Sequence, residues 1–165
     1  RYNSVAQVDS DTYALAYSGP DNDGFITTFT VPSNGSSITK VATIEHNTSD
    51  ASYNSLIQVD SDTYVLGYTG SDEDGFIATF TISSDGASIT EISELEHEAS
   101  KADYNSLEKV DSDTYALAYS GPDDDGFITT FTVASDGSSI TEVATIEHNT
   151  SDDSFNSMIQ VVSYN

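Results

Sequence analysis

The sequence contains no cysteine and no tryptophan, and it has only four basic residues against 28 acidic ones. Without cysteine there can be no disulfide, no thiol catalysis and no Cys-based zinc or iron–sulfur site. The formal net charge of −24 would repel phosphate backbones and anionic membrane surfaces, so we expect no nucleic-acid partner. No apolar run is long enough to span a bilayer, so we also expect no membrane insertion.

What the chain does have is a high content of acidic, Ser, Thr and Asn residues. This composition is typical of exported surface proteins and also of proteins from salt-adapted organisms, and it does not separate the two. We expect a secreted or cell-surface location. Glycosylation sequons begin at Asn34, Asn47 and Asn149, and they matter only in a host that glycosylates.

One short segment recurs at a fixed step of 51 residues, as YNSVAQVDSDTY from Tyr2, YNSLIQVDSDTY from Tyr53 and YNSLEKVDSDTY from Tyr104. Residues 2–52, 53–103 and 104–154 align without insertion or deletion, and the first copy shares 43 of 51 positions with the third and 30 with the second. Whatever one copy forms, all three must form. Residues 155–165 begin a fourth copy, which we interpret as its first strand. All the copies then belong to one repeat domain.

Apolar and polar residues alternate within each copy, which predicts β-strands. Four such runs occur in the first copy, at Ser4–Val8, Thr12–Ser18, Gly24–Val31 and Ser37–His46. The links between them are rich in residues that favour tight turns. The sequence therefore predicts an all-β fold with four antiparallel strands in each 51-residue repeat, and no amphipathic helix.

The second predicted strand has a large and a small face. Tyr13, Leu15 and Tyr17 fall on one side, and Ala14 and Ala16 fall on the other. A sheet with one face in water would carry charged residues where these alanines stand. Both faces are therefore predicted to be covered, with the large face of one copy packed on the small face of its neighbour.

In this architecture the chain resembles tandem-repeat β-propellers, and the resemblance covers all three copies. It implies that each copy is one four-stranded blade. No subfamily motif matches, because the Trp-Asp mark of WD40 blades and the paired glycines of kelch blades are missing. The segment SDEDGFIATF from Ser71 is similar to the Asp-box hairpin of sialidase-like propellers but departs from its glycine spacing and closing tryptophan. The resemblance thus carries no subfamily function.

Three Glu-His pairs end the last predicted strand of the copies, at Glu45-His46, Glu96-His97 and Glu147-His148. Because these pairs would lie on different blades, we expect structural or solvated histidines and no shared metal ion. Catalysis normally uses one asymmetric constellation, which near-identical copies do not supply. We therefore expect no enzymatic activity; the alternative is a fragment of a larger propeller enzyme whose site lies on other blades.

Aspartates two residues apart precede a glycine at one predicted hairpin tip of every copy. Carboxylates in this spacing can bind Ca²⁺ together with backbone carbonyls, although Asp is also an ordinary turn residue that bonds its own backbone. We keep calcium as the possible cofactor, and its candidate ligands are Asp21, Asp23, Asp72, Asp74, Asp123 and Asp125.

Each copy opens with a Tyr-Asn pair, which could give a sugar site its aromatic face and amide; the alternative is packing. The candidate glycan residues are Tyr2, Asn3, Tyr53, Asn54, Tyr104 and Asn105. Repeated exposed sites suit multivalent binding to a repetitive target such as a glycan coat. We predict an exported binding or adhesion module whose partner is a glycan or a surface protein. A structural scaffold or filament subunit is the alternative.

Propellers close with about four to eight blades, so three copies leave apolar faces that need a partner. We expect a second chain to close a ring of six blades, or further blades of a longer chain to do so. The fourth copy diverges at Val162, where the earlier copies have Asp9, Asp60 and Asp111. We interpret residues 162–165 as an evolved or processed end.

Overall fold

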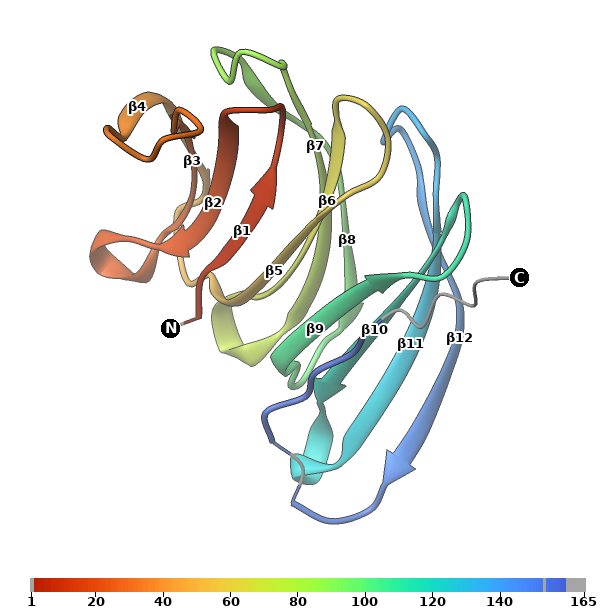
Figure 1. Ribbon diagram of the computed structural model, residues 1–165. Helices are drawn as coiled ribbons and strands as arrows, with labels where there is room; N and C mark the ends of the chain where they lie inside the picture. The colour runs from red at the N-terminus through yellow and green to blue at the C-terminus, as the bar shows by residue number, and fades with distance from the viewer. Residues whose placement is uncertain (1, 153, 160–165) are drawn as a thin grey trace.

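The computed structural model describes residues 2–152 and 154–159, and it is built of antiparallel β-sheets (Figure 1). The first sheet has the order β1-β2-β3-β4. Its strands are β1 (Ser4–Gln7), β2 (Thr12–Ser18), β3 (Gly24–Thr30) and β4 (Thr39–Asn47). The all-β fold with four antiparallel strands in each repeat is therefore confirmed, and the bounds of the strands differ from the predicted ones by at most two residues.

The other two copies form sheets of the same order. The second sheet contains β5 (Ser52–Gln58), β6 (Thr63–Thr69), β7 (Gly75–Ile82) and β8 (Ile89–Glu98). The third contains β9 (Asp103–Lys109), β10 (Thr114–Ser120), β11 (Gly126–Val133) and β12 (Ile140–Asn149). No helix among residues 2–152 and 154–159 is long and apolar enough to cross a membrane.

One link in each copy is a short 3₁₀ turn. These turns are η1 (Pro20–Asn22), η2 (Ser71–Glu73) and η3 (Pro122–Asp124). Asp21 and Asn22 have φ angles of 55° and 69°, a region that Asp and Asn tolerate better than most residues. The Asn22 carbonyl accepts the Ala51 N–H at 3.0 Å. The turn therefore also fixes the link that leads to the next sheet.

The three sheets lie side by side as a fan, with the first strand of each sheet innermost (Figure 1). β1 contacts β5, and β5 contacts β9. The Ser4 hydroxyl accepts the Leu56 N–H at 2.9 Å, and the Ser55 hydroxyl accepts the Leu107 N–H at 3.0 Å. The packing of the first sheet on the second is therefore repeated between the second and the third, including this hydrogen bond.

Large and small faces pack on each other as predicted. In the first sheet Tyr13 is paired with Phe29 and Tyr17 with Phe25, so the large residues of two strands share one face. The small face of the first sheet buries Ala14, Ala16 and Ile26 against the large face of the second. Tyr64, Leu66, Tyr68, Phe80 and Ile82 of that large face are all completely buried. The same arrangement joins the second sheet to the third.

A second hydrogen bond recurs between the sheets, at the turn that follows the third strand. The Thr28 hydroxyl donates to the Gly86 carbonyl at 2.7 Å, and the Thr79 hydroxyl donates to the Gly137 carbonyl at 2.8 Å. These glycines have φ angles of 71° and 73°, and both are buried by the neighbouring sheet. Their counterpart in the first copy, Gly35, is exposed and has no atom within 4 Å of a Cβ built on it.

Residues 154–159 follow the third sheet and are not assigned to a strand. They nevertheless repeat the contact of a first strand, because the Met158 N–H donates to the Ser106 hydroxyl at 2.9 Å. The position of Val162, and with it the predicted end of the fourth copy, lies outside the described residues.

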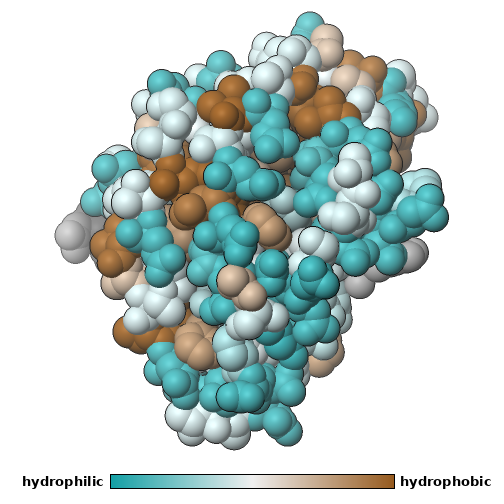
Figure 2. Space-filling model, turned by 180° about the vertical axis from the view of Figure 1, so that it is seen from behind, coloured by the Kyte–Doolittle hydropathy of each residue, from teal (hydrophilic) through white to brown (hydrophobic). Residues whose placement is uncertain are grey.

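The surface carries several separate hydrophobic groups among hydrophilic ones. Figure 2 shows them on the back of the molecule as brown patches between teal side chains. The large hydrophobic residues exposed on the outer strands and their approaches are Ile38, Val41, Ile92, Val143 and Ile146. Ile146 is 60% exposed, whereas its counterparts Ile44 and Leu95 pack against the next sheet. Within the residues that the structure describes, no further sheet therefore covers the small face of the third sheet.

Candidate functional site

The opening aromatic residues of all four copies meet in one cluster, which we call the axial cluster: Tyr2, Tyr53, Tyr104 and Phe155. Their ring centroids are 4.9 Å apart for Tyr2 and Tyr53, 4.6 Å for Tyr53 and Tyr104, and 4.8 Å for Tyr104 and Phe155. The rings converge because each one precedes or begins a first strand, and the first strands are innermost. The predicted tyrosines are thus brought together in one place, and they do not form one site on each sheet.

The rings border a hollow of about 150 Å³, which Asn105 and Asn156 also line. Tyr2 is 44% exposed and Phe155 is 68% exposed, so the aromatic faces are open to solvent. Ligand pockets that enclose a drug-sized molecule measure about 300–1,000 Å³. The hollow is therefore suited to one small ring or one face of a larger ligand.

The backbone at the axial cluster is strained. Tyr53, Tyr104 and Phe155 have φ angles of 50°, 56° and 63°, and large residues rarely adopt this left-handed region. A residue held there costs of order 1–3 kcal/mol and needs surrounding structure to hold it. The strand pairing of the second copy also shifts register between Ser52 and Ser55. The same strain recurs at the opening aromatic residue of the second, third and fourth copies.

The asparagines of the Tyr-Asn pairs have different roles. Asn54 is buried, and its amide nitrogen donates to the Tyr2 carbonyl at 3.2 Å. The amide nitrogen of Asn105 donates to the Thr69 hydroxyl at 3.1 Å. These bonds join neighbouring sheets, so the amide nitrogens of both residues are occupied by the protein. Asn3 is exposed and does not line the hollow.

The Tyr53 hydroxyl in the cluster stays neutral at ordinary pH. Burial, followed by a hydrogen bond with Tyr104, raises the pKa of Tyr53. Asp103 lies close by, and burial raises the pKa of its carboxyl as well. Lys101 pairs with Asp124, and its Nζ atom is 3.9 Å from Asp103 Oδ2. The site thus offers aromatic faces, tyrosine hydroxyls and one carboxylate near an ammonium group.

The six candidate calcium ligands lie at the three 3₁₀ turns, with the first aspartate of each pair exposed and the second half-buried. In the first copy Glu45 joins the pair, since a hydrogen bond with Asp23 raises the pKa of the Glu45 carboxyl. In the part of the chain that the structure describes, no three or more His, Cys, Asp or Glu side chains are grouped to hold a metal ion. Calcium binding stays a prediction.

The first two histidines of the Glu-His pairs pack between sheets. His46 lies edge-on to Tyr68 and Phe80, with centroids 5.1 and 5.6 Å apart. His97 contacts Tyr119 and Phe131 in the same way. Both ring nitrogens of each residue are buried without a hydrogen-bond partner. Burial lowers the pKa of both rings to about 4, so each is held as neutral imidazole.

One polar contact between the first two sheets is absent from the other copies. The Tyr68 hydroxyl donates to Glu94 Oε2 at 2.5 Å and accepts from Asn47 Nδ2 at 3.1 Å. The first and third copies have threonine where the second has Glu94, namely Thr43 and Thr145. Sequence reasoning missed this contact, although that difference between copies was a signal for it.

No protein-family model and no curated protein matches the sequence. Solved structures do match the fold. The periplasmic gluconolactonase PpgL of Pseudomonas aeruginosa matches over 85% of this chain and 41% of its own, with a TM-score of 0.66 and 12% identity. Sqt1 of Saccharomyces cerevisiae matches over 86% of this chain and 34% of its own, with a TM-score of 0.57 and 12% identity.

The chain has the blade architecture of a tandem-repeat β-propeller. A mutant NanB sialidase of Streptococcus pneumoniae matches over 87% of this chain and 23% of its own, with a TM-score of 0.60 and 15% identity. The chain thus spans between about a quarter and two-fifths of the length of these structures. At this identity the likeness shows the fold alone.

The comparisons correct one prediction, that the chain has no enzymatic activity. A gluconolactonase and a sialidase share the fold, so repeated blades do not exclude catalysis. The prediction failed because it assumed that copies of similar sequence have the same surroundings in the fold. The contact between Tyr68 and Glu94 exists in one copy only, and inner strands converge so that residues of several copies can share one site.

Proposed function

We propose that this propeller segment is a binding module of an exported protein, and that its axial cluster binds a carbohydrate. The observation that carries the proposal is the convergence of four aromatic rings, two of them exposed, on one hollow that two asparagines also line. An aromatic ring offers a flat apolar face, and a tyrosine hydroxyl adds a polar group at its rim. Sugar rings need both kinds of contact.

The size of the hollow supports recognition of one sugar unit at a time. Its volume is about 150 Å³, and the exposed faces of Tyr2 and Phe155 extend it at the edge. Such a site binds weakly alone, so useful affinity would come from several modules on a repetitive glycan coat. This favours an adhesion role for the exported protein, and the composition rich in acidic, Ser and Thr residues fits that location.

Glycan-array binding followed by titration of tyrosine fluorescence tests the proposal. The absence of tryptophan leaves tyrosine as the emitting residue, so a sugar stacked on the cluster changes the signal directly. The double variant Y53N/Y104N should abolish binding and keep the fold, because asparagine tolerates the positive φ of both positions. Ile92→Ala, at an exposed position on β8, is the matched control and should bind as the wild type. An array without a glycan that distinguishes these variants would refute the proposal.

A basic peptide or protein segment is the second candidate ligand. One solved structure with this fold is Sqt1 of Chaetomium thermophilum bound to the N-terminus of ribosomal protein L10, with 20% identity and a TM-score of 0.53 over 90% of this chain and 38% of its own. The net charge of −24 would favour basic partners. Such binding should weaken strongly with added salt, whereas stacking of a neutral sugar should not.

A further inference from the structure

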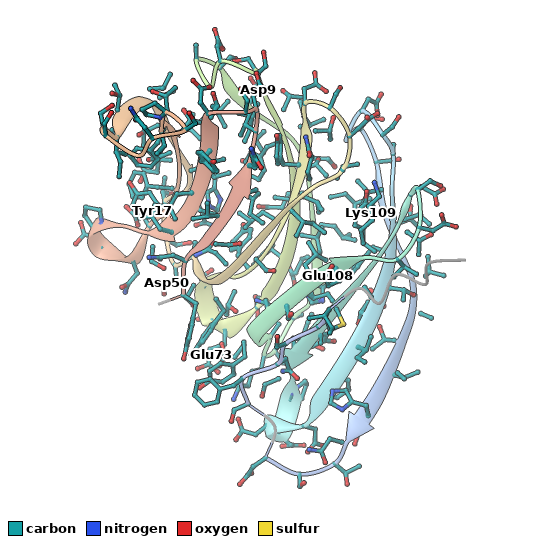
Figure 3. All side chains as sticks on the ribbon, in the orientation of Figure 1. Asp9, Tyr17, Asp50, Glu73, Glu108 and Lys109 are labelled. Carbon is teal, nitrogen blue, oxygen red and sulfur yellow. The ribbon has the colours of Figure 1, made fainter. Side chains whose placement is uncertain are left out.

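We propose that a second copy of this chain docks on the first sheet and closes a ring. The docking surface is the large face of the first sheet, which we call the open face: Tyr13, Leu15, Tyr17, Phe29 and Val31. All five side chains are half-exposed, whereas their counterparts in the second and third sheets are at most 1% exposed. Tyr17 lies on the side of its sheet that points away from the other two (Figure 3).

The open face is hollowed, and its lining is aromatic and aliphatic. A cavity of about 440 Å³ is lined there by Val5, Tyr13, Ala14, Leu15, Phe29, Val31 and Ile38. Aromatic and aliphatic surface of this kind is rarely left in water unless a partner covers it. The net charge of −24 keeps single chains apart at long range, so contact here depends on close apolar fit.

The chain itself shows which surface fits. Inside the molecule, the same large face is covered twice by the small face of the preceding sheet. Among residues 2–152 and 154–159 no sheet covers the small face of the third sheet, and there Ala116, Ile128 and Thr130 are half-exposed and Ile146 is 60% exposed. A second copy therefore presents the surface that this sequence already packs against the open face. The contact joins two different faces, so it leads around a ring.

The hydrogen bond that recurs between sheets, from a threonine to a glycine turn, also favours a second copy as the partner of the open face. Gly35 of the first sheet is exposed, while Gly86 and Gly137 are buried under Thr28 and Thr79. At the other end, the Thr130 hydroxyl donates to the Ala144 carbonyl of its own sheet at 3.3 Å, a contact that Thr28 and Thr79 also make. Among the described residues, Thr130 has no glycine turn of a neighbouring sheet as its second acceptor. Docking would let Thr130 of one chain reach the Gly35 carbonyl of the other.

Residues 154–159 decide how the two chains meet. They already make the contact of a first strand, through the Met158 N–H and the Ser106 hydroxyl, so they occupy the place of the incoming β1. One of the two must leave. β1 has four residues, against seven in β5 and in β9, and it is therefore the weaker strand. In the ring, residues 155–159 complete the first sheet of the second copy, and its β1 is displaced. Two chains then form six blades, within the usual range.

Disulfide trapping tests the contact, and the lack of cysteine makes it free of background. The variant G35C/T130C places one cysteine on each docking surface. The matched control T79C/G137C copies the same geometry within one chain, where a Cβ on Gly137 would lie 3.2 Å from the Thr79 Cβ, close to disulfide range. Under oxidation the control should close inside single chains. G35C/T130C should give a covalent dimer of twice 17.6 kDa.

Monomers of G35C/T130C, under conditions that oxidise the control fully, would overturn the second copy as the occupant and point to further blades of a longer chain. A ladder of longer products would overturn the closed pair and indicate a filament. Two deletions then test the strand assignment by light scattering. Removing residues 2–7 should leave the dimer, and removing residues 154–165 should abolish it. The reverse result would overturn the role given to residues 155–159.

Discussion

Lowering the pH from 8 to 5 should destabilise the protein through His46 and His97. Both rings lie between sheets against aromatic side chains, and no hydrogen-bond partner reaches their nitrogens. Burial lowers their pKa values from 6.5 to about 4. Between pH 6.5 and about pH 4, these two histidines are therefore protonated in the unfolded chain and neutral in the folded chain. The stability from these rings is complete above pH 6.5 and is lost as the pH falls toward 4.

The size of the effect follows from the two pKa values. With an unfolded pKa of 6.5 and a folded pKa of about 4, proton linkage gives a loss of about 2 kcal/mol for each ring at pH 5. Two rings lose about 4 kcal/mol, a large part of the roughly 5–15 kcal/mol that stabilises a typical domain. Glu45 and Glu91 act in the opposite direction, since their pKa values are raised in the folded state.

Chemical denaturation at pH 8 and pH 5, followed by tyrosine fluorescence, measures this loss. The variant H46Q/H97Q removes both titrating rings and keeps the carboxylates. Its free energy of unfolding should fall by about 4 kcal/mol less than that of the wild type between the two pH values. His148→Gln removes an exposed ring, leaves the two buried rings in place and serves as the control. If the wild type and the double variant show the same dependence on pH, the reasoning is refuted.

Three further perturbations test the packing and the turns. Gly24→Ala should lower stability by about 1–3 kcal/mol, because its Cβ would lie 2.6 Å from both Ala51 Cβ and His46 Nε2; a thermal melt that does not change contradicts this. Leu66→Ala, at a completely buried position, should lower the free energy of unfolding by about 2–5 kcal/mol, whereas Leu15→Ala should mainly weaken dimerisation in light scattering. If the six hairpin aspartates bind calcium, low millimolar CaCl₂ should raise the melting temperature more than NaCl at equal ionic strength; equal responses would remove calcium as the cause.

The sequence predicted the sheets well because every signal was repeated. Alternation of Tyr13, Leu15 and Tyr17 with Ala14 and Ala16 specified the strand and both of its faces, and the pairing register confirms this. The turn of η1 was predicted as a hairpin link. The positive φ angles at Asp21 and Asn22 were not predicted. They turn the Asn22 carbonyl toward the Ala51 N–H, a contact between distant parts of the chain that the local sequence does not show.

The sequence named the three tyrosines of the axial cluster as candidates, but it named neither Phe155 and Asn156 nor the geometry that brings the rings together. A spacing of 51 residues placed Tyr2, Tyr53 and Tyr104 on separate blades, and nothing in the local pattern shows that first strands lie innermost. Only the contacts of β1 with β5 and of β5 with β9 bring the rings within 5 Å or so of their neighbours. The burial of His46 was likewise invisible, because the aromatic rings that cover it belong to the next copy.

The hydrogen bonds from Thr28 to Gly86 and from Thr79 to Gly137 have a consequence for inheritance. Each sheet carries both halves of the junction, a threonine for one neighbour and a glycine turn for the other. Unequal recombination that inserts or removes one 51-residue unit would therefore leave a threonine and a glycine turn facing each other at every remaining junction. Genes of this kind can change length in a single event and still encode folded proteins. Selection then acts on the number of units, while point mutation adjusts the few positions at which the units differ.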